Sequence, residues 1–528
     1  MKKTFFQRWR SFRIWIGAAV LLSTVIIFIG RDFGWMPHWP SWPASGQAGP
    51  MVLRFLGHPA GLTAVAAGIV ILVTLLFGRV YCAMFCPLGI GQDLLGWILQ
   101  KLRLRKRESR PLPSLRVVRY AVLMVVIGGV ALGVALPLLL LDPYAITGRT
   151  LSLLFKPGLV AGNNLAVQTA GDGRFSALFP VAYVLPVWGV TAVAAGMLLL
   201  LALAVWRWGR IYCNSLCPVG AFLSLLSRIS WYKLEFAPTA CKHCRQCLNH
   251  CNAGCIDAAT RTLDFDRCVL CGNCAAFCKF NGLHWTRRYF RPRLDLPERR
   301  PENSPAETVP ISPGRRQFLA AAGTVAAGTV LLPSLHFQQQ KPPAEFPIMP
   351  PGAGDFDRLA AACVGCYLCV ENCPSKVIRP ALLQYGAGGI MLPHLDFGAS
   401  KCEFDCTACS NTCPTGALRP LTVAQKHVTQ IGRVKYFADR CVVTQCQADC
   451  GACAEHCPTG AVVMKPWKDG LRIPVTDVSL CVGCGACEHV CPVRPLRSIV
   501  VEGLSRQGQA KPPVQTAPVQ VKDNGFPF

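Results

Sequence analysis

Cysteine spacing constrains this chain more than any other feature. The sequence has 30 cysteines in 528 residues, and 28 of them fall into a few runs with stereotyped spacing. Disulfides, the common use of many cysteines, staple small secreted domains and have irregular spacings. The regular runs therefore predict ligation of metal ions or metal clusters.

Four apolar stretches predict an α-helical membrane domain over residues 1–235. Charged residues make up 16% of the chain, where about 25% is usual, and hydrophobic residues make up 52%. Each stretch is long enough for a helix to cross a hydrocarbon core of about 30 Å. The stretches cover residues 12–30, about 60–77, 120–141 and 185–206. This composition excludes a wholly soluble or disordered protein.

The distribution of basic residues predicts the orientation of these helices, because cytoplasmic loops carry an excess of lysine and arginine. The basic N-terminus and the loop 79–116, which holds eight basic residues, contrast with two in 31–59 and three in 142–184. The N-terminus and the segments after the second and fourth helices are therefore expected in the cytoplasm. This clustering beside apolar segments accounts for the net charge of +26 better than nucleic-acid binding does.

The membrane domain contains an internal repeat. Residues 78–98 (GRVYCAMFCPLGIGQDLLGWI) align without gaps to residues 209–229 (GRIYCNSLCPVGAFLSLLSRI). Each copy follows the second helix of a pair, which predicts a parallel duplication about an axis along the membrane normal. Both C-x-x-x-C-P motifs then lie on the cytoplasmic face.

The sequence leaves the role of the four motif cysteines open. These are Cys82 and Cys86 in the first copy and Cys213 and Cys217 in the second. Three roles fit: joint binding of one metal ion or cluster across the pseudo-symmetry axis, a thiol/disulfide relay, and a structural role. Both cysteines of a motif lie on one helix face, which suits all three.

Residues 236–286 predict a cytoplasmic two-cluster ferredoxin domain. A C-x-x-C-x-x-C loop wraps three corners of a [4Fe-4S] cluster while a remote cysteine closes the fourth. Asn252 departs from the pattern, because proline usually follows the fourth cysteine, and the surplus Cys255 is expected to be a small buried residue. By the crossed ligation of two-cluster ferredoxins, one set is Cys241, Cys244, Cys247 and Cys278, and the other is Cys268, Cys271, Cys274 and Cys251.

Residues 336–502 hold four further runs, each ending in Cys-Pro, and predict two fused ferredoxin-like pairs with four [4Fe-4S] clusters. The runs are Cys363, Cys366, Cys369, Cys373; Cys402, Cys406, Cys409, Cys413; Cys441, Cys450, Cys453, Cys457; and Cys481, Cys484, Cys487, Cys491. We expect the two outer runs to pair with each other and the two inner runs with each other. Cys446 is left over, as an alternative to Cys441 as a ligand.

Zinc is the main alternative to these six clusters. Structural zinc sites commonly pair two separated C-x-x-C knuckles, whereas three cysteines at this spacing plus a distant Cys-Pro fit a cubane better. There is no C-x-x-C-H for a c-type haem, no histidine within the four long spans, and no G-x-G-x-x-G opening a helix to hold a dinucleotide. The chain is therefore expected to carry electrons rather than transform a small substrate.

The remaining segments predict an export signal and two irregular regions. A Pro- and Arg-rich linker occupies residues 287–314. Residues 315–335, which begin RRQFLAAAG, resemble a twin-arginine signal that stays as an anchor helix, and an ordinary fifth helix with a basic flank is the alternative. Either interpretation places the C-terminal third in the periplasm. Residues 503–528 are expected to form a flexible tail.

Two family resemblances follow from these motifs. Residues 1 to about 290 resemble the NapH-type membrane ferredoxins, related to the NosR and CcoG membrane proteins, through GR(V/I)YCxxxCPxG twice and the ferredoxin that follows. Residues 313–500 resemble the NapG/MauM-type periplasmic ferredoxins through CVGCYLCVENCP, KCEFDCTACSNTCPTGALRP, CGACAEHCPTGAV and CVGCGACEHVCP. The resemblance implies a fusion of the two in a bacterial cytoplasmic membrane. Its fold would be a four-helix duplicated repeat with a fifth anchor helix and two α+β ferredoxin-like domains.

The resemblance also implies a function. The membrane part would oxidise menaquinol or ubiquinol, and the exported part would pass electrons to a periplasmic reductase such as nitrate reductase, or to a small cytochrome, in anaerobic respiration. An electron-donating maturation or regulatory factor for a periplasmic metalloenzyme, as among NosR-like and CcoG-like relatives, is the alternative. About 30 Å of hydrocarbon separates the two cluster groups. Either quinone shuttles across, or the motif cysteines bridge part of the gap, or the groups serve different reactions.

Overall fold

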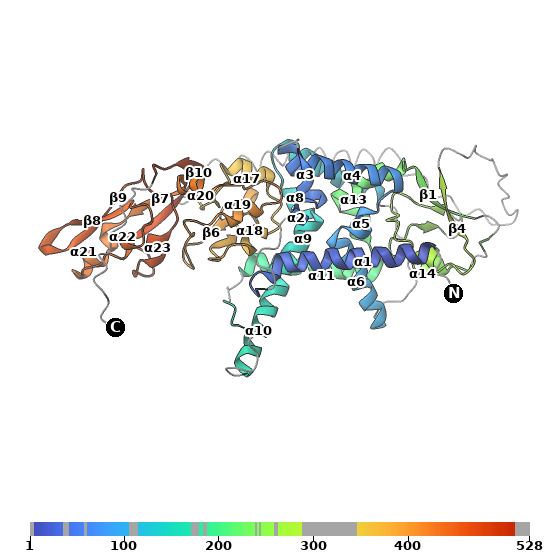
Figure 1. Ribbon diagram of the computed structural model, residues 1–528, viewed down its shortest axis with the longest axis horizontal. Coiled ribbons are helices and arrows are strands. Elements are labelled where there is room, and N and C mark those ends of the chain that lie inside the picture. The colour runs from blue at the N-terminus through green and yellow to red at the C-terminus, as the bar shows by residue number, and fades with distance from the viewer. Residues whose placement is uncertain are drawn as a thin grey trace, which may run out of the picture.

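A helical part of the chain lies between two cysteine-rich parts, as Figure 1 shows. The computed structural model describes residues 5–34, 42–57, 61–104, 115–170, 179–182, 187–237, 240–241, 244–257, 262–287 and 346–512. The expected linker 287–314, apart from its first residue, and the expected anchor helix 315–335 lie outside these residues.

Two of the expected membrane helices are long and apolar enough to cross a bilayer. The first comprises α1 (Phe5–Val25) and its π-helical continuation η1 (Ile26–Gly30), 26 residues in all, and the second is the 21-residue α11 (Trp188–Trp208). The apolar helix α4 (Leu62–Phe77) is shorter, at 16 residues. The other helices of this part are α2 (Trp42–Ser45), α3 (Ala48–Gly57), α5 (Tyr81–Met84), α6 (Pro87–Lys101), α7 (Arg116–Ala131), α8 (Leu136–Leu141), α9 (Pro143–Thr150), η2 (Leu151–Phe155), α10 (Lys156–Ala170), α12 (Ile211–Ser215) and α13 (Pro218–Arg228).

The apolar stretch 120–141 is not the single helix that the sequence analysis expects. Helix α7 ends at Ala131, and Gly133 follows with a φ of 75°, a conformation that glycine adopts readily. Helix α8 then starts with Pro137 in its first turn, where the missing N–H costs nothing. The side chain of Asp142 accepts a hydrogen bond from the Ala145 N–H at 2.8 Å and caps α9.

The two motif copies fold into the same succession of elements. Gly78 and Gly209 end α4 and α11 at φ values of 89° and 76°, and a short helix follows each of them. Cys86 and Cys217 are then the extended N-cap residues of α6 and α13, whose first helical residue is proline in both cases. Local sequence therefore sets the position of both motif cysteines in each copy.

The first cysteine-rich part is small and is built on two antiparallel strand pairs. Strand β1 (Tyr232–Phe236) pairs with β4 (Leu283–Arg287), with Leu234 opposite Trp285, and β2 (Ile256–Asp257) pairs with β3 (Thr262–Leu263). The short helices α14 (Gln246–Asn249) and α15 (Asn273–Ala276) carry cysteines of the two runs. This arrangement agrees with the expected α+β ferredoxin-like domain.

The second cysteine-rich part contains three antiparallel strand pairs. These are β5 (Ile378–Pro380) with β6 (Pro393–Leu395), β8 (Val462–Pro466) with β9 (Arg472–Thr476), and β7 (Thr429–Tyr436) with β10 (Ile499–Gln509). Its helices are α17 (Phe356–Ala362), α18 (Leu368–Glu371), η5 (Ala387–Gly389), α19 (Ala408–Thr412), α20 (Val423–His427), η6 (Ala438–Arg440), α21 (Val442–Cys446), α22 (Ala452–Glu455), η7 (Lys468–Gly470) and α23 (Ala486–Val490). The expected tail boundary at 503 is wrong, because β10 runs on to Gln509 and pairs there with Thr429.

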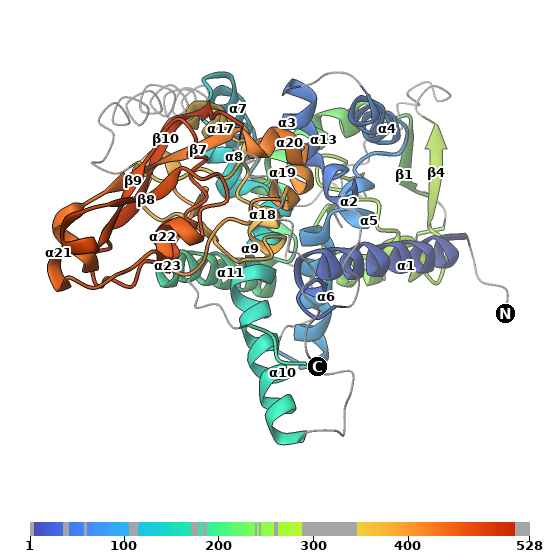
Figure 2. The same cartoon turned by 60° about the vertical axis from the view of Figure 1, so that its left-hand side comes forward.

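The second cysteine-rich part packs directly against the helical part, as Figure 1 and Figure 2 show. Leu139 and Val190 of the helical part belong to the same buried cluster as Tyr367 and Met391. A group of four charged side chains crosses the same interface. Lys156 Nζ contacts Glu371 and lies 2.5 Å from Asp32 Oδ2, while Lys376 Nζ lies 2.7 Å from Asp32 Oδ1.

Candidate functional site

The first ferredoxin-like part brings its cysteines together in the two sets expected from crossed ligation. One cavity of about 180 Å³ is lined by all four cysteines of the first set, which we name set A: Cys241, Cys244, Cys247 and Cys278. In set B, the Cys274 thiol interacts electrostatically with Cys271, Cys251 and Cys268. Four cysteine sulfurs gathered at one site match the number of ligands that a [4Fe-4S] cluster needs.

Burial of these thiols also fits a metal cluster. Burial raises the pKa of Cys271 to about 11 and the pKa of Cys363, in the second part, to about 12. Without a cation, such thiols stay protonated at neutral pH. Iron binds the thiolate form and supplies the positive charge that makes thiolates stable in a buried site.

The surplus Cys255 occupies a position that small residues hold elsewhere. It follows Cys251 by four residues, as Ala417 follows Cys413 and Ala461 follows Cys457, and all three side chains are buried. The Cys255 Sγ lies 3.5 Å from the Cys251 Sγ. This placement supports the expectation of a small buried residue.

We expect Cys255→Ala to keep the full iron content of the protein, because alanine fills the same position in two other runs. The matched variant Cys251→Ala removes a predicted ligand of set B and is expected to lose the iron of one cluster. Iron and acid-labile sulfide per chain, measured after anaerobic purification, give both results. Equal iron loss in the two variants would show that Cys255 is itself a ligand.

Consecutive runs pair in the second part, so the expected pairing of outer with outer and inner with inner runs is wrong. The Cys369 thiol interacts electrostatically with Cys363, Cys366 and Cys413, and more weakly with Cys409; we name the first four of these cysteines, Cys363, Cys366, Cys369 and Cys413, set C. One cavity is lined by Cys373, Cys402, Cys406 and Cys409, which define set D. The short antiparallel pair β5–β6 lies between these two runs in the sequence. Each run therefore gives three cysteines to one set and its last cysteine to the neighbouring set, as in the first part.

The third and fourth runs pair in the same way. The Cys487 thiol interacts electrostatically with Cys484, Cys481 and Cys457, and more weakly with Cys453; we name Cys457, Cys481, Cys484 and Cys487 set E. Cys441, Cys450, Cys453 and Cys491 line one cavity and form set F. Cys441 is buried there and Cys446 is exposed, so the structure favours Cys441 over Cys446 as the ligand.

The sets of the second part follow one another in space. Set C lies against the helical part, where Cys366 packs in one buried cluster with Phe28 and Tyr144. Sets C and D share the first pair of runs, and the Cys402 N–H of set D donates to the Cys484 carbonyl of set E at 2.9 Å. Set F lies beside α21 and β9, toward the end of the molecule farthest from the helices (Figure 1). The order away from the helices is therefore C, D, E, F.

The four motif cysteines also converge, although they come from distant parts of the sequence. Cys82, Cys86, Cys213 and Cys217 are all 5% exposed or less and belong to one buried cluster. Electrostatic interactions join every pair among their four thiols. This convergence fits joint binding of one metal ion or cluster, and it also fits a thiol/disulfide relay between the two copies.

Sequence reasoning missed the buried arginines around the motif cysteines. Arg79 and Arg210 are at most 1% exposed, and each is the arginine of a Gly-Arg-x-Tyr-Cys sequence. Arg119 and Arg149 are as deeply buried. The Gly-Arg pair that occurs in both motif copies could have predicted the burial of Arg79 and Arg210. An arginine at the same position of two copies, each beside an apolar helix, indicates a structural role.

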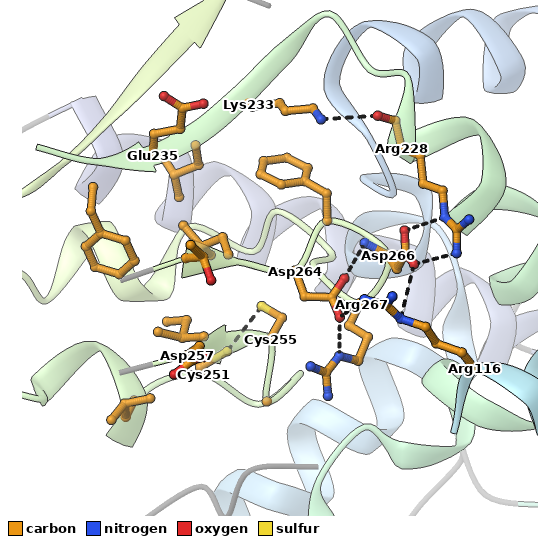
Figure 3. A pocket seen from close by; sticks show the side chains of 18 of the residues that line it. Arg116, Arg228, Lys233, Glu235, Cys251, Cys255, Asp257, Asp264, Asp266 and Arg267 are labelled. Carbon is orange, nitrogen blue, oxygen red and sulfur yellow. Dashed lines mark hydrogen bonds and ion pairs between the residues drawn. The ribbon is translucent and has the colours of Figure 1, made fainter. Parts of the chain in front are cut away.

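A large charged cleft lies beside set B, as shown in Figure 3. Its volume is about 1260 Å³, and Cys251 and Cys255 are among the residues that line it. Its arginines and aspartates pair with one another: Arg228 lies 2.7 Å from Asp266, and Arg267 lies 2.8 Å from Asp264. The positive and negative side chains of the cleft thus largely neutralise one another, and the cleft reaches from solvent to one side of set B.

A site for a single metal ion requires its ligands to lie closer together than the ligands of a cluster. In the part of the chain that the structure describes, no group of three or more histidine, cysteine or carboxylate side chains has the spacing needed to hold one metal ion. In a cubane, each thiolate binds a different iron atom, so its four sulfurs need not approach one another as closely as the ligands of one ion do.

Comparisons with known proteins agree with the cysteine pattern. Residues 58–106 and 190–235 match a family described as a 4Fe-4S binding domain, and residues 362–417 and 445–494 match a 4Fe-4S dicluster domain. The first pair of segments holds the two C-x-x-x-C-P motifs. The second pair agrees with the pairing of consecutive runs.

Three relatives each match a part of the chain. The ferredoxin-type protein NapF of Escherichia coli (strain K12) is 32% identical over 146 residues, 28% of this chain and 80% of that protein. The ferredoxin-type protein NapG of the same organism is 30% identical over 193 residues, 34% of this chain and 81% of that protein. The ferredoxin-type protein NapH of Haemophilus influenzae is 23% identical over 242 residues, 44% of this chain and 70% of that protein. No solved structure matches.

Proposed function

Because the chain belongs to the ferredoxin-type iron–sulfur proteins of the NapG and NapH type, we propose that it is a membrane-bound carrier of electrons between the quinone pool and a periplasmic oxidoreductase such as a nitrate reductase. The proposal assigns six [4Fe-4S] clusters to sets A to F. It places residues 1–235 in the cytoplasmic membrane, sets A and B on the cytoplasmic side, and sets C to F in the periplasm.

Exposed apolar side chains support the membrane location. Large hydrophobic side chains on three helices are more than two-thirds exposed: Trp15 on α1, Leu62 on α4, and Trp188 and Leu200 on α11. Both long apolar helices, α1 with η1 and α11, carry such exposed side chains. Lipid contact accounts for these side chains.

The observation that carries the proposal is the row of cysteine sets C, D, E and F, which leads away from the helices. A protein that only stored iron or stabilised its fold with clusters would not need them in a row that starts at the membrane part. Each [4Fe-4S] cluster, when bound, takes up and releases one electron at a time. The row therefore suits passage of electrons from the membrane to the far end of the molecule.

The chain's own residues hold this row in place. Quinol oxidation releases two electrons and two protons, so two single-electron transfers into the protein balance each turnover. Lys156, Lys376, Asp32 and Glu371 hold the second cysteine-rich part against the helices beside set C. Set F at the far end lies nearest to a docking partner, and transient redox partners need only a small interface.

Reduction by quinol tests the proposal. Full-length protein, purified without oxygen and placed in lipid vesicles, receives a menaquinol analogue while cluster absorbance is followed by stopped flow. We expect the clusters to become reduced within milliseconds to seconds. In Cys366→Ser, which removes a set C ligand, set F is expected to reduce at least tenfold more slowly, whereas Cys446→Ser serves as the matched control with unchanged kinetics.

The alternative function has a different outcome in the same preparation. If the clusters accept electrons from dithionite but not from quinol, while the protein activates a metal-free or oxidised partner enzyme, the quinol proposal fails. A maturation or regulatory factor then replaces it. Protease added to intact spheroplasts tests the topology, because residues 346–512 are expected to be digested while sets A and B are protected.

A further inference from the structure

The motif cysteines Cys82, Cys86, Cys213 and Cys217 form one site shared by both motif copies. Each copy contributes one cysteine from a short helix, α5 or α12, and one N-cap cysteine, of α6 or α13. Neither copy holds more than two of the four thiols. Any ligand of all four must therefore lie between the copies.

Crossed arginines tie the two copies together around this site. Arg79 of the first copy donates to the Cys213 carbonyl of the second at 2.8 Å, and Arg210 of the second donates to the Cys82 carbonyl of the first at 3.0 Å. A Cβ at Gly89 would lie 2.4 Å from the Cys82 carbonyl oxygen, and a Cβ at Gly220 would lie 2.4 Å from the Cys213 carbonyl oxygen. The glycine of each C-P-x-G sequence thus lets the first turn of α6 or α13 approach the carbonyl of the first motif cysteine. The arginine, the cysteines and the glycine of both motifs therefore belong to one paired structure.

One buried arginine beside the thiols lacks a counter-charge among the described residues, whereas Arg210 is paired with Asp93. Arg79 is completely buried, and no ion pair to it is found among the described residues; its guanidinium donates only to Asn214 Oδ1, the Asp266 carbonyl and the Cys213 carbonyl. Both Arg79 and Arg210 interact electrostatically with the Cys213 thiol. A buried cation without an anionic partner is costly, so this site calls for negative charge.

Hydrogen bonds to the thiols and a helix N-terminus beside them also favour negative charge at this site. The Gly220 N–H at the start of the 11-residue helix α13 donates to the Cys217 Sγ at 3.3 Å, and Gln92 Nε2 donates to the Cys213 Sγ at 3.5 Å. The first turn of a helix favours an anion. Four neutral thiols or two disulfides would leave these groups without an anion, whereas an iron–sulfur cluster with four thiolates supplies one.

The site also lies between the two ferredoxin-like parts. On one side, Arg210 interacts electrostatically with the motif cysteine Cys213 and with Cys271, which belongs to set B. The motif cysteines also share a buried cluster with the other three cysteines of set B, Cys251, Cys268 and Cys274. On the other side, the Tyr212 hydroxyl donates to the Leu141 carbonyl at 2.5 Å, next to α9, whose Tyr144 packs with Cys366 of set C.

We propose that Cys82, Cys86, Cys213 and Cys217 together hold one further iron–sulfur cluster, shared by the two motif copies, through which single electrons pass between sets B and C. Each transfer moves one electron from a reduced to an oxidised cluster and makes or breaks no covalent bond. The electron path rests on the proposed function, but the binding of the cluster does not.

Iron content tests the binding. Full-length protein carrying Cys82→Ser and Cys213→Ser together is purified anaerobically beside Cys446→Ser, whose exposed cysteine lies outside every set. We expect the double variant to lose the iron and labile sulfide of one cluster and to keep those of the other six. Unchanged iron and sulfide in the double variant would overturn the proposal.

A milder variant covers the case in which the double variant fails to fold. Gln92→Leu keeps the four thiols and removes one N–H···S hydrogen bond. Hydrogen bonds to sulfur help to set cluster potentials. We expect one EPR signal of the reduced protein to shift to a lower midpoint potential while the others stay fixed. Identical redox titrations of Gln92→Leu and wild type would contradict a cluster at this site.

One-sided reduction tests the path separately from the quinol reaction. Dithionite is added outside sealed vesicles that hold the protein in one orientation. In wild type we expect all clusters to bleach in one phase, and in the double variant we expect only those on the exposed side to do so. A single phase in both would show that electrons bypass the motif cysteines, whether or not quinol is the natural donor.

Discussion

Replacing Asp93 with asparagine is expected to lower the free energy of unfolding by about 3–5 kcal/mol, the usual cost of breaking a buried ion pair from one side. The Asp93 carboxylate binds Arg210 at 2.7 and 2.8 Å and Arg13 at 3.1 Å, and it accepts a hydrogen bond from Asn252 Nδ2 at 3.1 Å. It thereby joins α6 to α1, to the start of α12 and to the loop after Cys251. Asparagine leaves two buried guanidinium groups without a counter-charge.

Unfolding in detergent, followed by circular dichroism and by loss of cluster absorbance, measures this effect. Asp449→Asn makes the same chemical change in a pair with Arg472 that is 3.6 Å long and more than half exposed. Such surface pairs contribute about 0–1 kcal/mol. Equal effects of the two substitutions would mean that Asp93 is not a junction of the helical part.

The cysteine sets illustrate what spacing can determine. Sets A and B follow from the sequence because crossed ligation depends on local loops, each of which carries three cysteines on one tight turn. Cys255 follows as well, from its alignment with Ala417 and Ala461. The pairing of the four later runs does not follow, because spacing within a run does not say which neighbour closes its cluster. That choice depends on the packing around β5 and β6.

Contacts between distant segments explain the other differences. The order of sets C to F becomes visible only in the folded chain, where the Cys402 N–H donates to the Cys484 carbonyl and Cys366 packs against Tyr144. The crossing of Arg79 and Arg210 depends on how the two motif copies meet. The break after α7 is readable from Gly133 and Pro137, a glycine and a proline within an apolar run long enough to span a bilayer.

A second large effect is expected at the interface between the helical part and set C. The Glu371 side chain is 8% exposed and contacts Lys156, which also binds Asp32, and Asp32 in turn binds Lys376. The two positive charges of the lysines and the two negative charges of the carboxylates cancel. Glu371→Gln removes one anion and leaves a buried excess of positive charge, so we expect the docking of residues 346–512 to weaken by about 3–5 kcal/mol.

Hydrogen exchange of α18 and limited proteolysis of full-length protein in micelles measure this docking. Glu502→Gln is the matched control, since its pair with Lys435 is 2.6 Å long but 35–50% exposed. Adding Lys376→Met to Glu371→Gln restores the charge balance, because Lys156 and Asp32 remain as one pair, and we expect it to recover part of the lost protection. If Glu371→Gln behaves like Glu502→Gln, this charged group does not hold set C against the helices, and the apolar contacts of Leu139 and Val190 and the hydrogen bond from Arg31 to Asn372 must do so.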